Sequence, residues 1–292
     1  MDRLLSQLIN GLHVGSVYAL IALGYTMVYG IVKLINFAHG DIIMVGAYAA
    51  LMLFTNTALP FVVVVVMAVA VCVVLGVVIE RIAYKPLRSS PRISSLITTI
   101  GVSFFLQNSI QLMFSPTPRP FPVRVNLPSL IVGPLRVSGL TLLTILTAVA
   151  LMILLELFVR RTRMGKAMRA VSEDISAAQL MGININTTIS VTFAIGACLA
   201  AVGAVLYSTA YPTVSPTMGA LPGLKAFIAA VLGGIGLMPG AMIGGFIMGV
   251  AESLTKGYVS TQLADAVVFG ILIIVLLVKP SGLLGKNVNE KV

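Results

Sequence analysis

A short polar segment, residues 36–41, interrupts an otherwise apolar stretch near the N-terminus. It reads Asn-Phe-Ala-His-Gly-Asp, and its His39 and Asp41 can either relay protons or act as hydrogen-bonded structural groups. Gly40 can break a helix, and the side chains of Asn36 and Asp41 can cap the helix ends that the break exposes. Backbone groups freed in this way must line a cavity or lie buried in protein if the segment is in a bilayer.

A second break, Gly-Gly-Ile-Gly-Leu-Met-Pro-Gly at 233–240, divides the apolar segment 224–254 into two pieces that both look too short to span comfortably. Paired interrupted helices in the two halves of a chain indicate a transport site near the bilayer midplane. The alternative is that both breaks are turns at the membrane surface between hairpin helices. The candidate residues of a translocation path are Asn36, His39, Asp41, Gly233, Gly234, Gly236 and Pro239.

Motifs for chemistry by this chain alone are missing from the sequence. It contains no G-x-x-x-x-G-K-[ST] phosphate loop, no G-x-S-x-G and no HExxH. The two histidines and two cysteines do not have the spacing of metal ligands. We therefore expect no catalytic residue, no metal site, no cofactor bound by this chain and no enzymatic activity. Cys72 and Cys198 lie in apolar segments, which favours buried free thiols over a disulfide.

The composition places these residues in a membrane. Of the 292 residues, 58% are hydrophobic and 10% are charged, and the mean hydropathy is +1.06. Soluble domains carry about 25% charged residues, so a soluble globule is excluded. Because a crossing helix needs about 20 apolar residues, we predict one all-α polytopic membrane domain, 1–292, with about eight to nine transmembrane or half-spanning helices, two of them Gly-interrupted. The predicted crossings are 8–32, 41–54, 60–79, 94–114, 140–159, 187–209, the split segment 224–254, and 263–278.

The net charge of +10 does not indicate nucleic-acid binding, because the basic residues lie in short loops between apolar runs. Two such loops lie at 81–92 and 160–169, and the positive-inside rule places both on the cytoplasmic side. Lys279, Lys286 and Lys291 place the C-terminus there too. Loop 115–139 is Pro-rich and carries fewer basic residues, so we expect an external loop without a helix.

The basic loop 160–185 predicts a short helix over 173–181. Ser172 can serve as its N-cap, Glu173 and Asp174 suit its first turn, and Gly182 suits the position just after its end. Such a helix can dock to a partner protein or rest on anionic lipid.

Spacing between glycines and between opposite charges makes further predictions. The pairs 11/15, 236/240, 240/244 and 245/249 have the small-x-x-x-small spacing of closely packed membrane helices, within this chain or at a dimer seam. Ion pairs are expected between Glu80 and Arg81 and between Glu156 and Arg160.

Along nearly its whole length the chain resembles the permease subunits of bacterial branched-chain amino-acid ABC transporters, above all the shorter, first permease of the pair. The matching stretches are 8–12, 15–24, 35–41, 163–170, 224–236 and 239–245. Importer permeases contact their ATPases through an E-A-A-x-x-x-G segment, and residues 176–182 read Ser-Ala-Ala-Gln-Leu-Met-Gly, with Ser in place of Glu. The resemblance implies that the ATPase-coupling residues are Arg169, Glu173, Ala177, Ala178 and Gly182.

The resemblance also implies the partners and location of the chain. It would lie in the bacterial inner membrane with a second related permease, two ATPase subunits that hold ATP and Mg, and a periplasmic binding protein that delivers leucine, isoleucine or valine. Two alternatives are open: a sibling ABC permease for urea, amides or sugars, and a stand-alone secondary transporter or channel.

Overall fold

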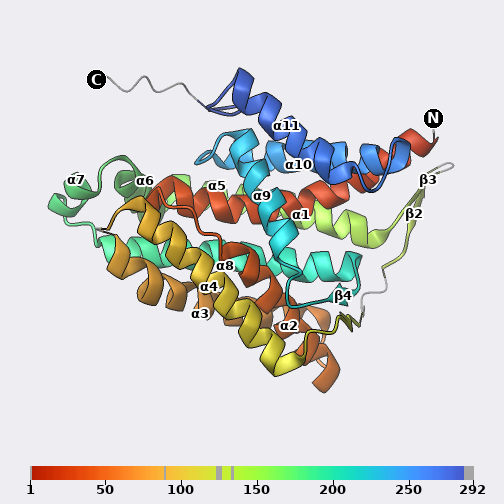
Figure 1. Ribbon diagram of the computed structural model, residues 1–292, viewed down its shortest axis with the longest axis horizontal. Helices are drawn as coiled ribbons and strands as arrows, with labels where there is room; N and C mark the ends of the chain where they lie inside the picture. Colours follow the sequence, from red (N-terminus) through yellow and green to blue (C-terminus); the bar gives the residue numbers. More distant parts are fainter. Residues whose placement is uncertain (1, 89, 123–126, 133–134, 286–292) are drawn as a thin grey trace.

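The computed structural model describes residues 2–88, 90–122, 127–132 and 135–285, and its elements are shown in Figure 1. The α-helices are α1 (Asp2–Val32), α2 (His39–Asn56), α3 (Phe61–Ile79), α4 (Arg92–Phe114), α5 (Gly139–Arg161), α6 (Arg163–Glu173), α7 (Ile175–Leu180), α8 (Ile185–Ala210), α9 (Ala220–Gly233), α10 (Met238–Tyr258) and α11 (Ala264–Val278). Within this described part, strands are confined to two short antiparallel pairs, β1 (Arg119–Pro120) with β4 (Thr213–Val214) and β2 (Leu130–Val132) with β3 (Leu135–Val137).

The predicted all-α membrane fold is confirmed, because each predicted crossing coincides with a helix. Five helical segments among the described residues are long and apolar enough to span a bilayer: Arg3–Val32, Phe61–Leu87, Ile93–Phe114, Gly139–Arg161 and Ile185–Ala210. α9 and α11 are apolar but shorter, with 14 and 15 residues. α10 has 21 residues, which is longer than the sequence predicted for this piece, but it carries Glu252 and Lys256 and is not among the five segments that are apolar enough to span.

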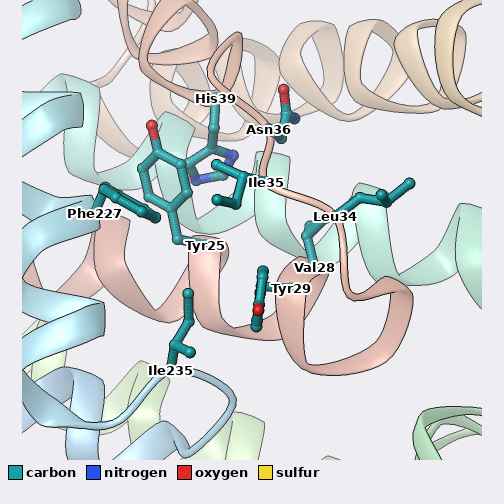
Figure 2. Close-up of a pocket in the computed structure, with 9 residues that line it drawn as sticks. All are labelled: Tyr25, Val28, Tyr29, Leu34, Ile35, Asn36, His39, Phe227 and Ile235. Atoms are coloured by element: carbon teal, nitrogen blue, oxygen red, sulfur yellow. The ribbon is translucent and has the colours of Figure 1, made fainter. Parts of the chain in front are cut away.

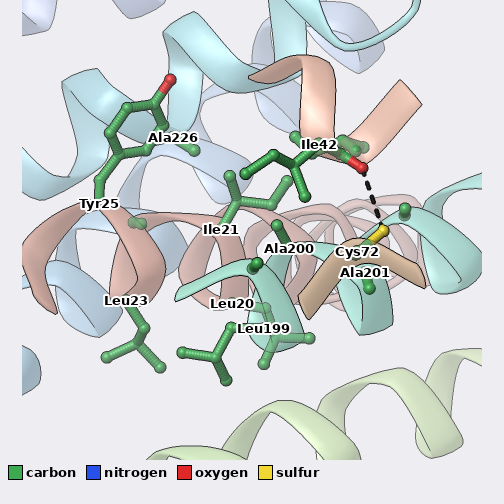
Figure 3. Packing of buried hydrophobic residues seen from close by; sticks show 14 of the residues in the cluster. Leu20, Ile21, Leu23, Tyr25, Ile42, Cys72, Leu199, Ala200, Ala201 and Ala226 are labelled. Atoms are coloured by element: carbon green, nitrogen blue, oxygen red, sulfur yellow. Dashed lines mark hydrogen bonds between the residues drawn. The ribbon is translucent and has the colours of Figure 1, made fainter. Parts of the chain in front are cut away.

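α1 lies in the middle of the bundle, with α10 and α11 on one side and α8, α3 and α4 on the other (Figure 1). Its central residues are fully buried and pack against small side chains of α8, as Figure 3 shows for Leu20 and Ile21 beside Ala200 and Ala201. Cys72 of α3 completes this core by donating a hydrogen bond from Sγ to the carbonyl oxygen of Ile42 in α2, 3.6 Å away. Cys72 and Cys198 are both free thiols, and of the two only Cys72 is fully buried as predicted, while Cys198 is half-buried.

α1 and α10 cross in close contact because both helices carry glycines where they meet. A Cβ on Gly11 would lie 2.6 Å from Cα of Val250, and one on Gly15 would lie 2.9 Å from the carbonyl oxygen of Gly245. A Cβ on Gly249 would collide with the backbone of Gly15. These glycine pairs therefore pack two helices of the same chain, which confirms the first of the two interpretations.

One end of the bundle, which we call the basic end, carries residues 80–88 together with α6 and α7 (Figure 1). Arg88 links residues 80–88 to the start of α8: it donates to Oδ1 of Asn186, 2.7 Å away, and pairs with Glu80. Glu80 also accepts a hydrogen bond of 2.6 Å from Ser190. The predicted Glu80–Arg81 pair is thus wrong, because the turn after α3 points Arg88, and not Arg81, at the carboxylate.

The opposite end, which we call the strand end, carries the N-terminus and β1–β4 (Figure 1). The described residues between α4 and α5 contain no helix, as predicted, although their short strands were not expected. Arg124 and Pro134 of this loop, and Lys286 and Lys291 of the predicted basic C-terminus, lie outside the described residues.

Candidate translocation and coupling sites

α2 begins inside the bundle and not at its end. After Val32 the chain turns back along α1, so that His39, the first residue of α2, packs against Gly24 and Tyr25. Gly24 is eight residues before the end of α1, about 12 Å at a rise of about 1.5 Å per residue. The first turn of α2 therefore lies inside the bundle, about 12 Å along α1 from its end.

The imidazole of His39 sits among apolar and aromatic groups (Figure 2). Its ring centroid is 4.5 Å from that of Tyr25, which in turn is 5.8 Å from that of Phe227. A Cβ on Gly24 would lie 2.5 Å from His39 Nε2, so glycine at this position makes room for the ring. Nε2 has no hydrogen-bond partner among the described residues. These surroundings favour a packing role for His39 over that of a proton relay.

The turn before α2 is closed by backbone groups. The carbonyl oxygen of Asn36 accepts from the N–H of His39 at 3.1 Å, and Ala38 occupies the N-cap position without a side-chain cap. The predicted capping by the side chains of Asn36 and Asp41 is therefore wrong, because a tight backbone turn takes its place. The buried Asn36 side chain has no hydrogen-bond partner in the described part of the chain.

Asp41 lies in a groove between α2, α4 and α9. Gln107 of α4 donates from Nε2 to Oδ1 of Asp41 at 2.8 Å, and Ser103 lies 3.2 Å from the same Nε2. Asp41 is 2% exposed, and no ion pair found among the described residues includes it. A buried carboxylate without a cation is costly at this depth, which indicates a functional group. Sequence reasoning missed Ser103 and Gln107, although two polar residues four apart in a predicted crossing were the available signal.

The start of α9 meets the start of α2 at Gly40. A Cβ on Gly40 would lie 2.7 Å from the carbonyl oxygen of Gly219, and a Cβ on Gly223 would lie 2.7 Å from Cα of Gly40. β4 pairs with β1, so residues 215–219 reach this point from the strand end, whereas residues 33–38 reach it from the basic end. The N-terminal ends of two helices, where the helix dipole is positive, thus converge beside Asp41.

The second glycine break lies at the basic end. α9 ends at Gly233, and Gly234 and Gly236 have φ values of +107° and +93°, which glycine adopts without strain. Gly236 and Pro239 line a cavity of about 790 Å³ together with Glu173 of α6 and with Lys33, Ser172 and Pro280.

The predicted path residues that line a cavity therefore lie in three places. Asn36 and His39 share a small pocket with Ile235, the residue of the second break that reaches them (Figure 2). Asp41 lines the groove on the other side of Tyr25, while Gly236 and Pro239 face α6. The structure does not bring Asp41 and Pro239 into one site.

The coupling segment consists of two helices and not one. Glu173 is the last residue of α6, and Asp174 is the N-cap of α7, where its Oδ1 accepts from the N–H of Ala177 at 2.9 Å. Ser172 donates its hydroxyl hydrogen to the carbonyl oxygen of Arg169, 2.7 Å away. The predicted helix 173–181 with Ser172 as its N-cap is thus wrong, because the Asp174 carboxylate makes the cap two residues later.

Gly182 ends α7 as predicted. Its φ is +80°, its N–H donates to the carbonyl oxygen of Gln179 at 3.0 Å, and the N–H of Ile183 donates to that of Ala178 at 3.1 Å. This pair of bonds is the Schellman motif. Ala178 is buried, while Leu180 and Met181 are 89% and 83% exposed, so α7 presents apolar side chains outward at the basic end.

A network of charged side chains lies between α1, α9, α10 and α11. The sequence indicated only that these residues flank helix ends, and not that they contact one another. Glu252 pairs with Lys225 at 3.0 Å and with Lys256 at 2.6 Å, and it accepts from the hydroxyl of Tyr18 at 2.8 Å. Lys225 also pairs with Asp265 at 2.6 Å. Two cations and two carboxylates thus neutralise one another and tie α9 to α10 and α11.

Residues 7–277 match the family described as the permease component of the branched-chain amino acid transport system. Among curated relatives, the high-affinity branched-chain amino acid transport system permease protein BraD of Pseudomonas aeruginosa is 45% identical over 301 residues, which cover 99% of this chain and 98% of the relative. The LivH proteins of Escherichia coli K12 and Salmonella typhimurium, which carry the same description, are 45% and 44% identical over 311 residues, 99% of this chain and 97% of each relative. No solved structure matches the chain significantly. The full-length match and the apolar helices agree, and the chain belongs to the family of multi-pass permease components of branched-chain amino acid transport systems.

Proposed function

We propose that the chain is one of two permease subunits of an ATP-driven ABC importer for leucine, isoleucine and valine in the bacterial inner membrane. The observation that carries this proposal is the identity of about 45% over nearly the full length to permeases described as acting in branched-chain amino acid transport. The chain has no phosphate-binding loop of its own, so ATP and Mg would be held by two separate ATPase subunits.

The basic end is the cytoplasmic face in this proposal. Its two Lys/Arg-rich segments, 81–92 and 160–169, lie at the same end of the bundle (Figure 1), and the positive-inside rule places such segments in the cytoplasm. α11 runs back toward this end, so the C-terminus would be cytoplasmic (Figure 1). The strand end would then face the periplasm, where a binding protein delivers the substrate.

The α6–α7 unit is the proposed contact with the ATPases. It presents Arg169, Glu173 and Ala177 at the surface, and the apolar side chains of Leu180 and Met181 extend from the end of α7. Ala178 is buried and holds α7 against the bundle, and Gly182 fixes the direction in which the chain leaves it. Exposed apolar side chains beside basic ones suit a protein partner.

Reconstitution tests the proposal directly. The chain is placed in proteoliposomes with and without the second permease, the two ATPases and the binding protein, and leucine uptake is measured. We expect uptake only in the full assembly and only with hydrolysable ATP. Uptake by the chain alone under an imposed ion gradient would instead identify a secondary transporter.

Gly182→Val should weaken association with the ATPases. A β-branched residue is strained at a φ of +80°, at a cost of roughly 1–2 kcal/mol, so the end of α7 should fray. No atom lies within 4 Å of the position of a Cβ, so the effect comes from the backbone and not from a clash. Gly182→Asn is the matched control, because asparagine tolerates this region. Co-purification of the ATPases should fall for Val and persist for Asn, and equal co-purification of both variants would contradict the coupling role of α7.

A further inference from the structure

The Asp41 groove combines one unpaired carboxylate with apolar walls. Its volume is about 200 Å³, and its polar groups are Asp41, Ser103, Gln107 and Tyr25. Its apolar walls are Phe37, Ile100, Leu224 and Phe227. Phe37 and Phe227 stand with ring centroids 6.2 Å apart. The carboxylate and the apolar walls thus line one small space.

This combination matches the chemistry of an apolar amino acid in its zwitterionic form. Asp41 has a hydrogen bond from Gln107 but no ion pair with a cation of the described residues, so an ammonium group would supply the missing charge. A branched aliphatic side chain would bury its surface against Phe227 and Leu224. The carboxylate would lie toward the start of α9, where the positive end of the helix dipole favours an anion.

We infer that this groove is a substrate half-site in which Asp41 binds the α-ammonium group of a branched-chain amino acid and Phe227 and Leu224 hold its side chain. The inference rests on the proposed transport function and adds how the substrate is recognised within the membrane. Leu224 and Phe37 are 39% and 37% exposed, so the groove opens on the outer surface of the subunit. A charged group at this depth does not face lipid, and the second permease therefore supplies the opposite wall.

The half-site is tested by the equilibrium binding of radiolabelled leucine. For this measurement the chain is assembled with its second permease in nanodiscs, without binding protein or ATPases. Asp41→Asn should weaken leucine binding by about tenfold to a hundredfold, as expected for the loss of a charge-assisted hydrogen bond. The wild type should bind 4-methylpentanoate, which is leucine without its amine, no better than Asp41→Asn binds leucine. Glu156→Gln removes a half-buried carboxylate outside the groove and should change nothing.

A second pair of variants tests the apolar wall. Leu224→Ala should weaken binding of leucine by a larger factor than binding of alanine, because only leucine reaches the wall. Leu221→Ala lies in the same helix outside the groove, has a 56% exposed side chain, and should leave both affinities unchanged. The half-site is wrong if the wild type binds no leucine, if Asp41→Asn binds it equally well, or if Leu221→Ala acts like Leu224→Ala.

The outcomes separate this inference from the proposed importer. If uptake depends on ATP but leucine binding is the same in the wild type and in Asp41→Asn, the half-site is wrong and the proposed importer stands. If leucine binding depends on Asp41 but uptake needs no ATPase, the proposed importer is wrong and the half-site stands.

Discussion

Replacing Gly249 by leucine should strongly reduce the amount of folded chain recovered from the membrane. A Cβ at this position would meet the backbone N and Cα of Gly15, and backbone atoms cannot move aside as a flexible side chain can. α1 and α10 would therefore have to separate. Lipid offers no hydrophobic force that would hold them together once this close packing is lost. Overpacking a tight contact costs about 1–3 kcal/mol and occasionally more. The measurements are the monodisperse yield after detergent extraction and the midpoint of thermal unfolding.

Gly270→Leu is the matched control for this prediction. Gly270 lies in α11, and no heavy atom lies within 4 Å of the position of a Cβ there. The same added side chain should therefore leave yield and midpoint close to those of the wild type. Equal losses of yield and midpoint for the two variants would mean that leucine destabilises the chain at any glycine of a membrane helix. The α1–α10 contact would then have no special role.

The membrane-spanning helices could be predicted because each depends on a local property, a long run without charge. The limits of α3, α4 and α8 fall within about two residues of the predicted ones for this reason. The two breaks were also visible, since glycine and polar residues in an apolar run act locally. The type of each cap was less predictable, because Ser172 and Asp174 are both good N-caps and the packing of α6 decides between them.

The position of each helix break within the bundle, and the residues that contact it, could not be predicted because they depend on distant parts of the chain. The sequence marks Gly40 as a helix break but does not show that Gly219 and Gly223, about 180 residues later, pack on it. Gln107 reaches Asp41 from another helix, 66 residues away. The second break seemed equivalent to the first, yet it lies at the basic end because α9 starts deep in the bundle and runs outward.

The charge network shows the same dependence on tertiary structure. Glu252 and Lys225 are 2% and 6% exposed, and they come from different helices. Glu252 also holds Lys256 and Tyr18, so it is the centre of the network. Charges withdrawn from water in this way are stable only while each retains its partner.

Glu252→Ala should accordingly destabilise the chain by about 3–5 kcal/mol, since it leaves the ammonium group of Lys225 buried with only Asp265 beside it. The pair of Glu156 and Arg160, at 2.6 Å and with side chains 25% and 70% exposed, is the matched control, and Glu156→Ala should cost about 0.5 kcal/mol or less. The double variant Lys225→Met/Glu252→Leu should recover much of the loss, because it leaves no buried charge uncompensated: Lys256 and Asp265 lose these partners, but their side chains are 37% and 46% exposed and can be solvated. Unfolding midpoints of the four chains in one detergent decide the matter. If Glu252→Ala is as mild as Glu156→Ala, or if the double variant is worse than the single one, then the network does not hold α9 to α10 through its charges.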